Sequence, residues 1–156
     1  MAYWLMKSEP DAYSIDDLER DGREPWDGIR NYQARNLIRD DMKVGDQALF
    51  YHSSCKVPAA VGIMNIVSEA YPDPTQFDAN AKYFDAKSDP DDPRWLLRDV
   101  EFVRKLERPV TLKELKAHPD LEDFQLNKRG NRLSILPVTK AQWRTILSLE
   151  KTPPEA

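Results

Sequence analysis

The sequence has little of what builds a covalent or metal-based site. It contains one cysteine, Cys55, so an internal disulfide is excluded. Its two histidines, His52 and His118, form no cluster with the spacing of metal ligands, so we expect no metal and no cofactor. Because no evident nucleophile accompanies His52, we also expect no catalytic residue and a protein that is not an enzyme.

Long apolar runs and excess positive charge are lacking as well. No run approaches the length that crosses a membrane, and Met1-Ala2-Tyr3-Trp4 lacks the basic and then apolar layout of a secretion signal. We therefore expect a cytoplasmic protein with no membrane partner. The formal net charge of -4 argues against sequence-blind wrapping on a phosphate backbone, which needs a strongly basic face. Any nucleic-acid recognition must therefore depend on a pocket.

The chain has enough apolar residues to bury one core. With 156 residues, of which 40% are hydrophobic, it matches the size of one globular domain. We expect that domain over residues 1–150 and a frayed tail over residues 151–156. The oligomeric state is not indicated by any pattern.

Local patterns predict strands and short helices that alternate without a regular βαβ period, which favours a mixed α+β domain. We expect strands over residues 2–6, 48–52, 59–69 and 99–106, the second and third being antiparallel neighbours. In the last strand Val100, Phe102 and Leu106 should share one buried face, and Pro109 should end it. Helices should follow capping boxes at Ser14, Thr111 and Thr139 and an Asn31 cap, the first ending at Gly22 and the one after Asn31 at about residue 39.

Residues 72–95 form a long irregular excursion rather than a linker. This stretch holds four prolines and many aspartates, a composition typical of turns. Its aromatic neighbours should pin it to the core, namely Tyr71, Phe77, Tyr83, Phe84 and Trp95. Loops of that length are often functional.

Two short segments combine aromatic and polar groups as a pocket for a flat, hydrogen-bonding ligand would. Trp26 and Asp27 precede Gly28 in a tight turn, so the Trp26 ring is either a pocket wall or a core residue. Lys7, Ser8 and Glu9 follow the first strand and either border that pocket or form an exposed strand end with an ion pair.

Further candidates lie elsewhere along the chain. Asn31, Tyr32 and Arg35 stand where a helix begins, which suits an anion, although a cap and a core contact explain the first two equally well. Arg30 and Arg39 look like solvated charges. His52 and Ser53 end a strand near these motifs, and Trp95 either closes the pocket or anchors the excursion. Residues 128–134, with Arg132 and Ser134, form either a phosphate-steering turn or a plain basic turn.

Several of these motifs together resemble the EVE-domain family. They are Tyr3-Trp4-Leu5-Met6-Lys7-Ser8-Glu9-Pro10, Trp26-Asp27-Gly28-Ile29-Arg30-Asn31-Tyr32-Gln33-Ala34-Arg35-Asn36, Tyr51-His52-Ser53, Tyr83-Phe84-Asp85 and Gly130-Asn131-Arg132-Leu133-Ser134. The resemblance spans roughly residues 2–147. It implies a PUA-like pseudobarrel, which is a bent, mostly antiparallel sheet with short flanking helices. EVE domains are also related to YTH domains, in which an aromatic cage holds a modified base.

The resemblance therefore implies a binding module that recognises a modified nucleobase in DNA or RNA. Trp26 would be the stacking wall, Ser8, Glu9 and Asn31 would contact the base edge, and Arg35, His52 and Arg132 would hold phosphate. Two alternatives remain open. Fold-level similarity to ASCH amidohydrolases suggests a hydrolase of a modified nucleoside using Lys7 and Glu9, and the long excursion suggests a protein-interaction adaptor.

Overall fold

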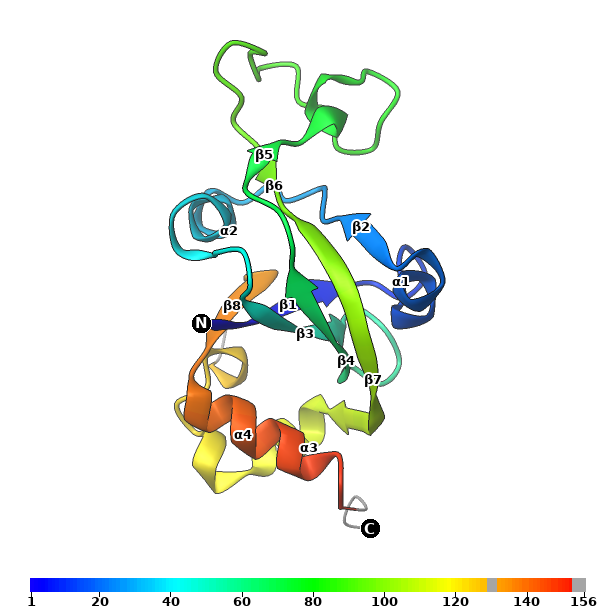
Figure 1. The fold of residues 1–156 in the computed structure, drawn as a ribbon, viewed down its shortest axis with the longest axis vertical. Helices are drawn as coiled ribbons and strands as arrows, with labels where there is room; N and C mark the ends of the chain where they lie inside the picture. Colours follow the sequence, from blue (N-terminus) through cyan, green and yellow to red (C-terminus); the bar gives the residue numbers. More distant parts are fainter. Residues whose placement is uncertain (129–131, 153–156) are drawn as a thin grey trace.

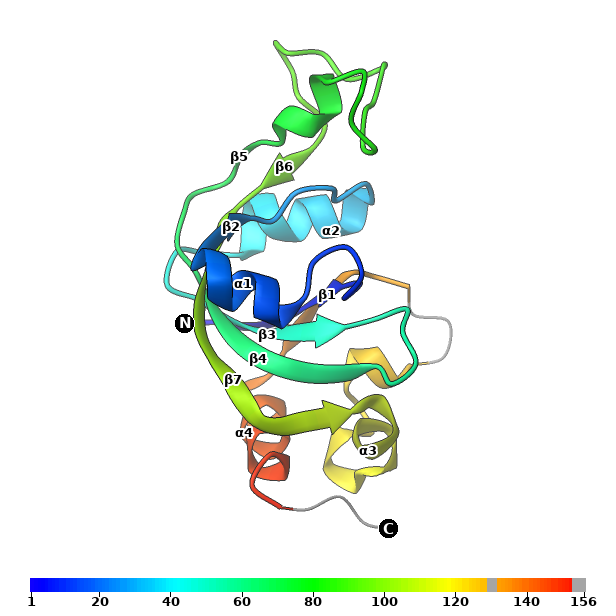
Figure 2. The same cartoon turned by 90° about the vertical axis from the view of Figure 1, so that its right-hand side faces the viewer.

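The protein is built on one curled sheet with helices on both faces (Figures 1 and 2). The structure is a computed structural model and describes residues 1–128 and 132–152. The sheet has the strand order β2-β7-β4-β3-β1-β8, in which β1 pairs parallel to β3 and every other pair is antiparallel. Its strands are β1 (Tyr3–Ser8), β2 (Arg23–Pro25), β3 (Gln47–His52), β4 (Ala59–Ile66), β7 (Asp99–Thr111) and β8 (Ile135–Val138). The expected mixed α+β class with a bent, mostly antiparallel sheet is confirmed.

The helices begin where the sequence signals place them. They are α1 (Ile15–Asp21), α2 (Tyr32–Asn36), α3 (Leu112–Ala117) and α4 (Lys140–Leu149), with a π-helical turn, η1 (Leu37–Asp41), continuing α2. Capping boxes form at Ser14, Thr111 and Thr139, and Asn31 caps α2 by accepting from the Ala34 amide. Gly22 ends α1 with a φ of 76°.

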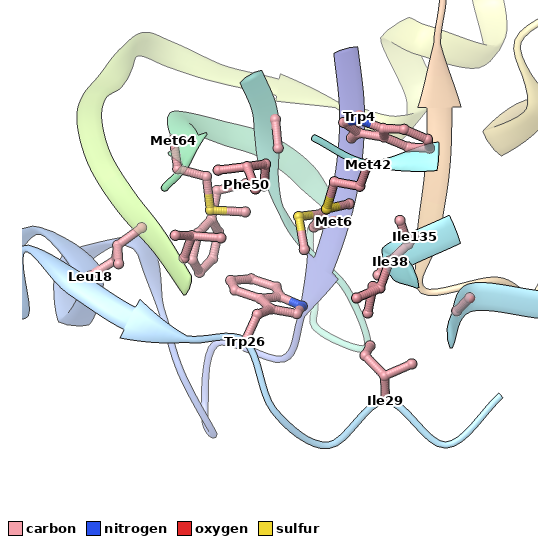
Figure 3. Close-up of a cluster of buried hydrophobic side chains, with 14 of the residues drawn as sticks. Trp4, Met6, Leu18, Trp26, Ile29, Ile38, Met42, Phe50, Met64 and Ile135 are labelled. Atoms are coloured by element: carbon pink, nitrogen blue, oxygen red, sulfur yellow. The ribbon is translucent and has the colours of Figure 1, made fainter. Parts of the chain in front are cut away.

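Two hydrophobic clusters lie on opposite faces of the sheet. In Figure 2, α1 and α2 lie on one side of the sheet and α3 and α4 on the other. The middle of β1 is buried on both faces, so Trp4 and Met6 of β1 belong to the first cluster and Leu5 to the second. Figure 3 shows the first cluster, in which Trp26 packs beside Met6 and Phe50. This packing fixes the loop after β2 against the end of β1.

Strand β7 differs from the prediction in two respects. The pairing with β4 shifts register between Met64–Phe102 and Ile63–Arg104, which is a β-bulge. The extra residue reverses the faces, so Val100 and Phe102 contact the first cluster while Leu106 lies in the second. The strand also continues past Pro109 to Thr111, because a second register shift leaves that proline outside the ladder, where no N–H is needed.

The predicted irregular excursion is present, but polar groups hold it together. Its base is a two-stranded ladder of β5 (Tyr71–Pro72) and β6 (Leu96–Leu97), and a short 3-10 helix, η2 (Pro74–Phe77), follows β5 (Figure 1). The Gln76 side chain is fully buried and donates to the Asp73 and Trp95 carbonyls. Of the expected aromatic anchors, only Trp95 is buried, whereas Tyr71, Phe77 and Phe84 are more than a third exposed. The prediction that aromatic side chains pin the excursion to the core was therefore wrong for those three residues.

The remaining described segments complete the second face. Short 3-10 helices η3 (Pro119–Leu121) and η4 (Gln125–Asn127) link α3 to β8. Among the described residues, no helix combines the length and the apolar character needed to span a bilayer, and no cluster of three acidic, cysteine or histidine side chains has metal-binding geometry. The predicted division at residue 150 stays a prediction, since residues 153–156 lie outside the described part.

Candidate functional site

A cavity of about 610 Å³ opens where β1 ends, which is within the size range of small-molecule sites. Its walls come from the β1–α1 turn, the loop after β2, the β3–β4 loop, the excursion and the segment before β8. The lining residues are Lys7, Ser8, Glu9, Ala12, Tyr13, Glu24, Pro25, Trp26, Asp27, Gly28, Ile29, Ser53, Ser54, Lys82, Tyr83, Arg132 and Ser134. The two segments that the sequence singled out therefore meet at one hollow.

Backbone hydrogen bonds bring three of these segments together. The Lys7 amide donates to the Ser134 carbonyl at 2.8 Å, and the Ser53 amide donates to the Ser8 carbonyl at 3.0 Å. The Ser8 hydroxyl donates to the Tyr13 carbonyl at 2.6 Å, which closes the turn after β1. These bonds explain why predicted site residues far apart in the sequence share one cavity.

Trp26 is both a core residue and a cavity wall. The residue is 7% exposed, and its ring meets the Phe50 ring edge-on at 5.4 Å. Figure 3 shows the indole directed into the first cluster. Trp26 is also one of the residues that line the cavity, so the structure combines the two interpretations that the sequence left open.

Tyr83 forms a wall that the sequence did not assign to the site. Gly28 has a φ of +83°, and a Cβ atom there would lie 2.6 Å from Cε2 of Tyr83. The tyrosine ring therefore packs directly on the Gly28 backbone, an approach that only glycine allows. The signals that could have found it are the Asp27-Gly28 turn and an aromatic residue beside Lys82 in the excursion.

Arg30 ties the excursion to this wall. Its guanidinium donates to the Tyr83 carbonyl from Nε at 3.0 Å and from Nη2 at 2.6 Å, and Nη1 pairs with Asp73 at 3.1 Å. It is 20% exposed and Asp73 is fully buried, so the expectation that Arg30 is a solvated charge was wrong. Burial alone would raise the pKa of Asp73, but hydrogen bonds from Thr75, from the Gly28 amide and from Arg30 hold that pKa below its usual value.

The lining mixes carboxyl and cationic groups. Burial raises the pKa of Asp27, and the nearby Asp73 charge raises it further. Burial also raises the pKa of Glu24 and lowers that of Lys7. A carboxyl group with a raised pKa can accept a hydrogen bond when ionised and donate one when protonated. Arg132 and Lys82 are exposed cations on the same lining.

Four predicted site residues lie together outside this lining. Tyr32 stacks on Trp95 with ring centroids 4.8 Å apart, and the Arg35 guanidinium lies 4.8 Å from the Tyr32 ring. Trp95 is 5% exposed and donates from Nε1 to Asp85, as an anchor of the excursion would. Asn31 accepts from the Ala34 amide at 3.0 Å, as a helix cap.

His52 is also outside the lining. Its Nε2 atom accepts the Ile15 amide at 3.1 Å and so holds the start of α1. Burial lowers the pKa of His52, which favours the neutral ring that this bond requires. The sequence could not foresee this contact because it depends on where α1 packs on the sheet.

Comparisons with known proteins agree on one family. The family described as EVE domain matches residues 2–149. Human thymocyte nuclear protein 1 is 44% identical over 172 residues, which covers 98% of this chain and 76% of that protein. A crystal structure of a Pseudomonas syringae protein has 50% identity and a TM-score of 0.92 over 96% of this chain and 99% of that chain.

Two solved structures of complexes are also similar. The human THYN1 protein in complex with DNA containing 5-methylcytosine is 43% identical with a TM-score of 0.94, covering 99% of this chain and all of that chain. The YTH domain of Zygosaccharomyces rouxii MRB1, in complex with N6-methyladenosine RNA, has 11% identity and a TM-score of 0.56, covering 99% of this chain and 89% of that one. The second likeness concerns the fold alone, and together they confirm the expected PUA-like architecture.

Proposed function

This chain belongs to the EVE-domain family, and on that premise we propose that it binds a modified nucleobase of DNA or RNA in the cavity lined by Trp26. The observation that carries the proposal is the 610 Å³ cavity, which joins aromatic rings, carboxyl groups and exposed cations. The human THYN1 complex with 5-methylcytosine DNA supports it, because that protein is 43% identical over almost the whole chain.

Each class of lining residue suits one part of such a ligand. Trp26, Tyr13 and Tyr83 offer apolar and aromatic surface, which rewards an added methyl group through van der Waals contact. Asp27 and Glu24, with raised pKa values, can accept from an exocyclic amino group or donate to a ring nitrogen. Lys82 and Arg132 are cations of the same lining and would contact the backbone phosphate of the same nucleotide.

A titration tests the proposal. Fluorescence anisotropy would compare oligonucleotides carrying 5-methylcytosine, 5-hydroxymethylcytosine, N6-methyladenine or the plain base, as DNA and as RNA. We expect a preference of about tenfold for at least one modified base, since one methyl group contributes on the order of 1–3 kcal/mol. Equal affinity for every modified and plain oligonucleotide would contradict the proposal.

A carboxyl variant locates the binding site. Asp27→Asn removes a titratable group from the cavity, and we expect it to weaken binding of the preferred oligonucleotide by several-fold. Asp41→Asn makes the same chemical change at an exposed position of η1 and should leave binding unchanged. Equal affinities of the two variants would place the binding site elsewhere.

Hydrolysis of a modified nucleoside is a second candidate, favoured by one observation. Lys7 and Glu9 both line the cavity, and burial lowers the pKa of Lys7, which favours the neutral amine that a general base needs. Incubation with N4-acetylcytidine tests it, with Lys7→Ala as the control. Absence of deacetylation, together with retained oligonucleotide binding by the variant, would remove this candidate.

Other expectations stay predictions. A cytoplasmic location needs cell fractionation, and the choice between DNA and RNA needs the titration above. The adaptor hypothesis rests on the exposed aromatic residues of the excursion, Tyr71, Phe77 and Phe84.

A further inference from the structure

A second cavity of about 550 Å³ adjoins the first. It lies between the end of β1, the β3–β4 loop, α3 and η4. Its lining residues are Lys7, Tyr51, Ser53, Ser54, Pro58, Leu112, Lys116, Leu126, Asn127 and Lys128. Lys7, Ser53 and Ser54 also line the first cavity, so these three residues form the partition between the two.

The charge of the second cavity differs from that of the first. Three lysines line it, and no carboxyl group does among the residues that the structure describes. Lys116 and Lys128 are exposed, and neither forms an ion pair with another residue of the described ranges. On a chain with a net charge of -4, such a group of unpaired cations is a local anion-attracting site.

The wall that carries these lysines is fixed by Asn127. Its Nδ2 atom donates to the Leu115 carbonyl at 2.9 Å and to the Leu121 carbonyl at 3.0 Å, which joins η4 to α3 and η3. Its Oδ1 atom is buried without a partner in the described part of the chain. Lys116 follows Leu115 and Lys128 follows Asn127, so this one amide joins the two backbone segments that carry these cations.

The partition between the cavities has an unusual backbone. Ser54 has a φ of 53°, and it is the one residue other than glycine with a positive φ in the described ranges. A left-handed backbone is strained for a serine, and such conformations concentrate at ligand-contacting sites. Burial also lowers the pKa of Lys7 in this partition, and a nearby anion would favour its charged form.

We propose that the second cavity is a phosphodiester subsite, in which Lys116 and Lys128 hold the backbone of the nucleotide next to the base in the first cavity. The inference rests on the proposed function, because the shared partition then places consecutive nucleotides on either side of Lys7 and Ser54. Lysine acts as a point charge on phosphate and does not distinguish bases. The subsite therefore contributes affinity equally to modified and plain strands.

The test is the salt dependence of binding to single-stranded oligonucleotides. For K116Q/K128Q we expect the slope of log K against log salt to become shallower by roughly 1.4, since each phosphate contact on a single strand contributes about 0.7. At ~50 mM salt, affinity should fall about tenfold or more for modified and plain strands alike. Binding of the free modified nucleoside, which has no phosphate, should not change.

Two further variants act as controls. K113Q/K151Q removes the same charge from exposed lysines outside both linings and should keep most of the wild-type slope. K116R/K128R keeps the charge and should restore the slope, which separates an electrostatic role from a folding defect.

Each outcome bears on one claim. An equal slope for K116Q/K128Q and K113Q/K151Q overturns the subsite. If K116Q/K128Q no longer distinguishes modified from plain strands, the subsite is also overturned, because the lysines would then contribute to base recognition. A wild-type protein that binds both strands equally overturns the proposed function, while the slope measured on plain strands still decides the subsite.

Discussion

Replacing Arg30 with lysine should destabilise the protein far more than the same change at Arg39. Arg30 donates to Asp73, to the Thr75 hydroxyl and twice to the Tyr83 carbonyl. A lysine ammonium cannot reproduce that planar set of donors, and Asp73 is fully buried. Hydrogen bonds to charged groups contribute about 1.5–3 kcal/mol each and overlap here, so we expect a loss of roughly 2–4 kcal/mol in the free energy of unfolding.

Arg39 provides the matched control. It pairs with its neighbour Asp40, both side chains are about half exposed, and exposed pairs contribute about 0–1 kcal/mol. Urea unfolding followed by tryptophan fluorescence measures both variants, and anisotropy then measures ligand affinity, which should fall in Arg30→Lys because the Tyr83 wall is released. Unfolding free energies of the two variants within about 0.5 kcal/mol of each other would refute the role assigned to Arg30.

Two further predictions concern the cavity wall and pH. Gly28→Ala should destabilise more than Gly22→Ala and should also weaken ligand binding, because both positions have similar positive φ but only at Gly28 would the new methyl group meet the Tyr83 ring. Urea unfolding and anisotropy compare them, and equal losses would contradict the close approach. For pH, burial holds the pKa of His52 below 6.5, the model-peptide value. The folded state then binds fewer protons than the unfolded state, so this contribution is present above pH 6.5 and is lost as pH falls through the folded pKa. An NMR titration of the His52 ring that gives a pKa at or above 6.5 would exclude this effect.

Features set by adjacent residues could be predicted from the sequence. The capping boxes at Ser14, Thr111 and Thr139 need only a side chain and an amide three residues apart, so local chemistry decides them. The meeting of the Lys7 and Trp26 segments at one cavity was likewise expected, on the strength of the family resemblance.

Features set by distant partners could not be predicted. Strand β2 has no alternating pattern and exists because β7 pairs with it, and β8 contains Pro137, which an edge strand tolerates. The sequence predicts a solvated charge for both Arg30 and Arg39. Only the contacts of Arg30 with the folded excursion distinguish the two. In that excursion, buried Gln76 and exposed Phe84 reverse the usual assignment of polar and apolar residues.

The short ladder at the base of the excursion allows this segment to be replaced as a unit. Because β5 and β6 already hold its two ends together, the tip can change in length with little effect on the sheet, at about 0.6 kcal/mol for each doubling. The tip also supplies Lys82 and Tyr83 to the cavity. Transplanting this segment between family members, with Asp73 and Thr75 kept as partners of Arg30, would therefore alter ligand preference while the sheet stays intact.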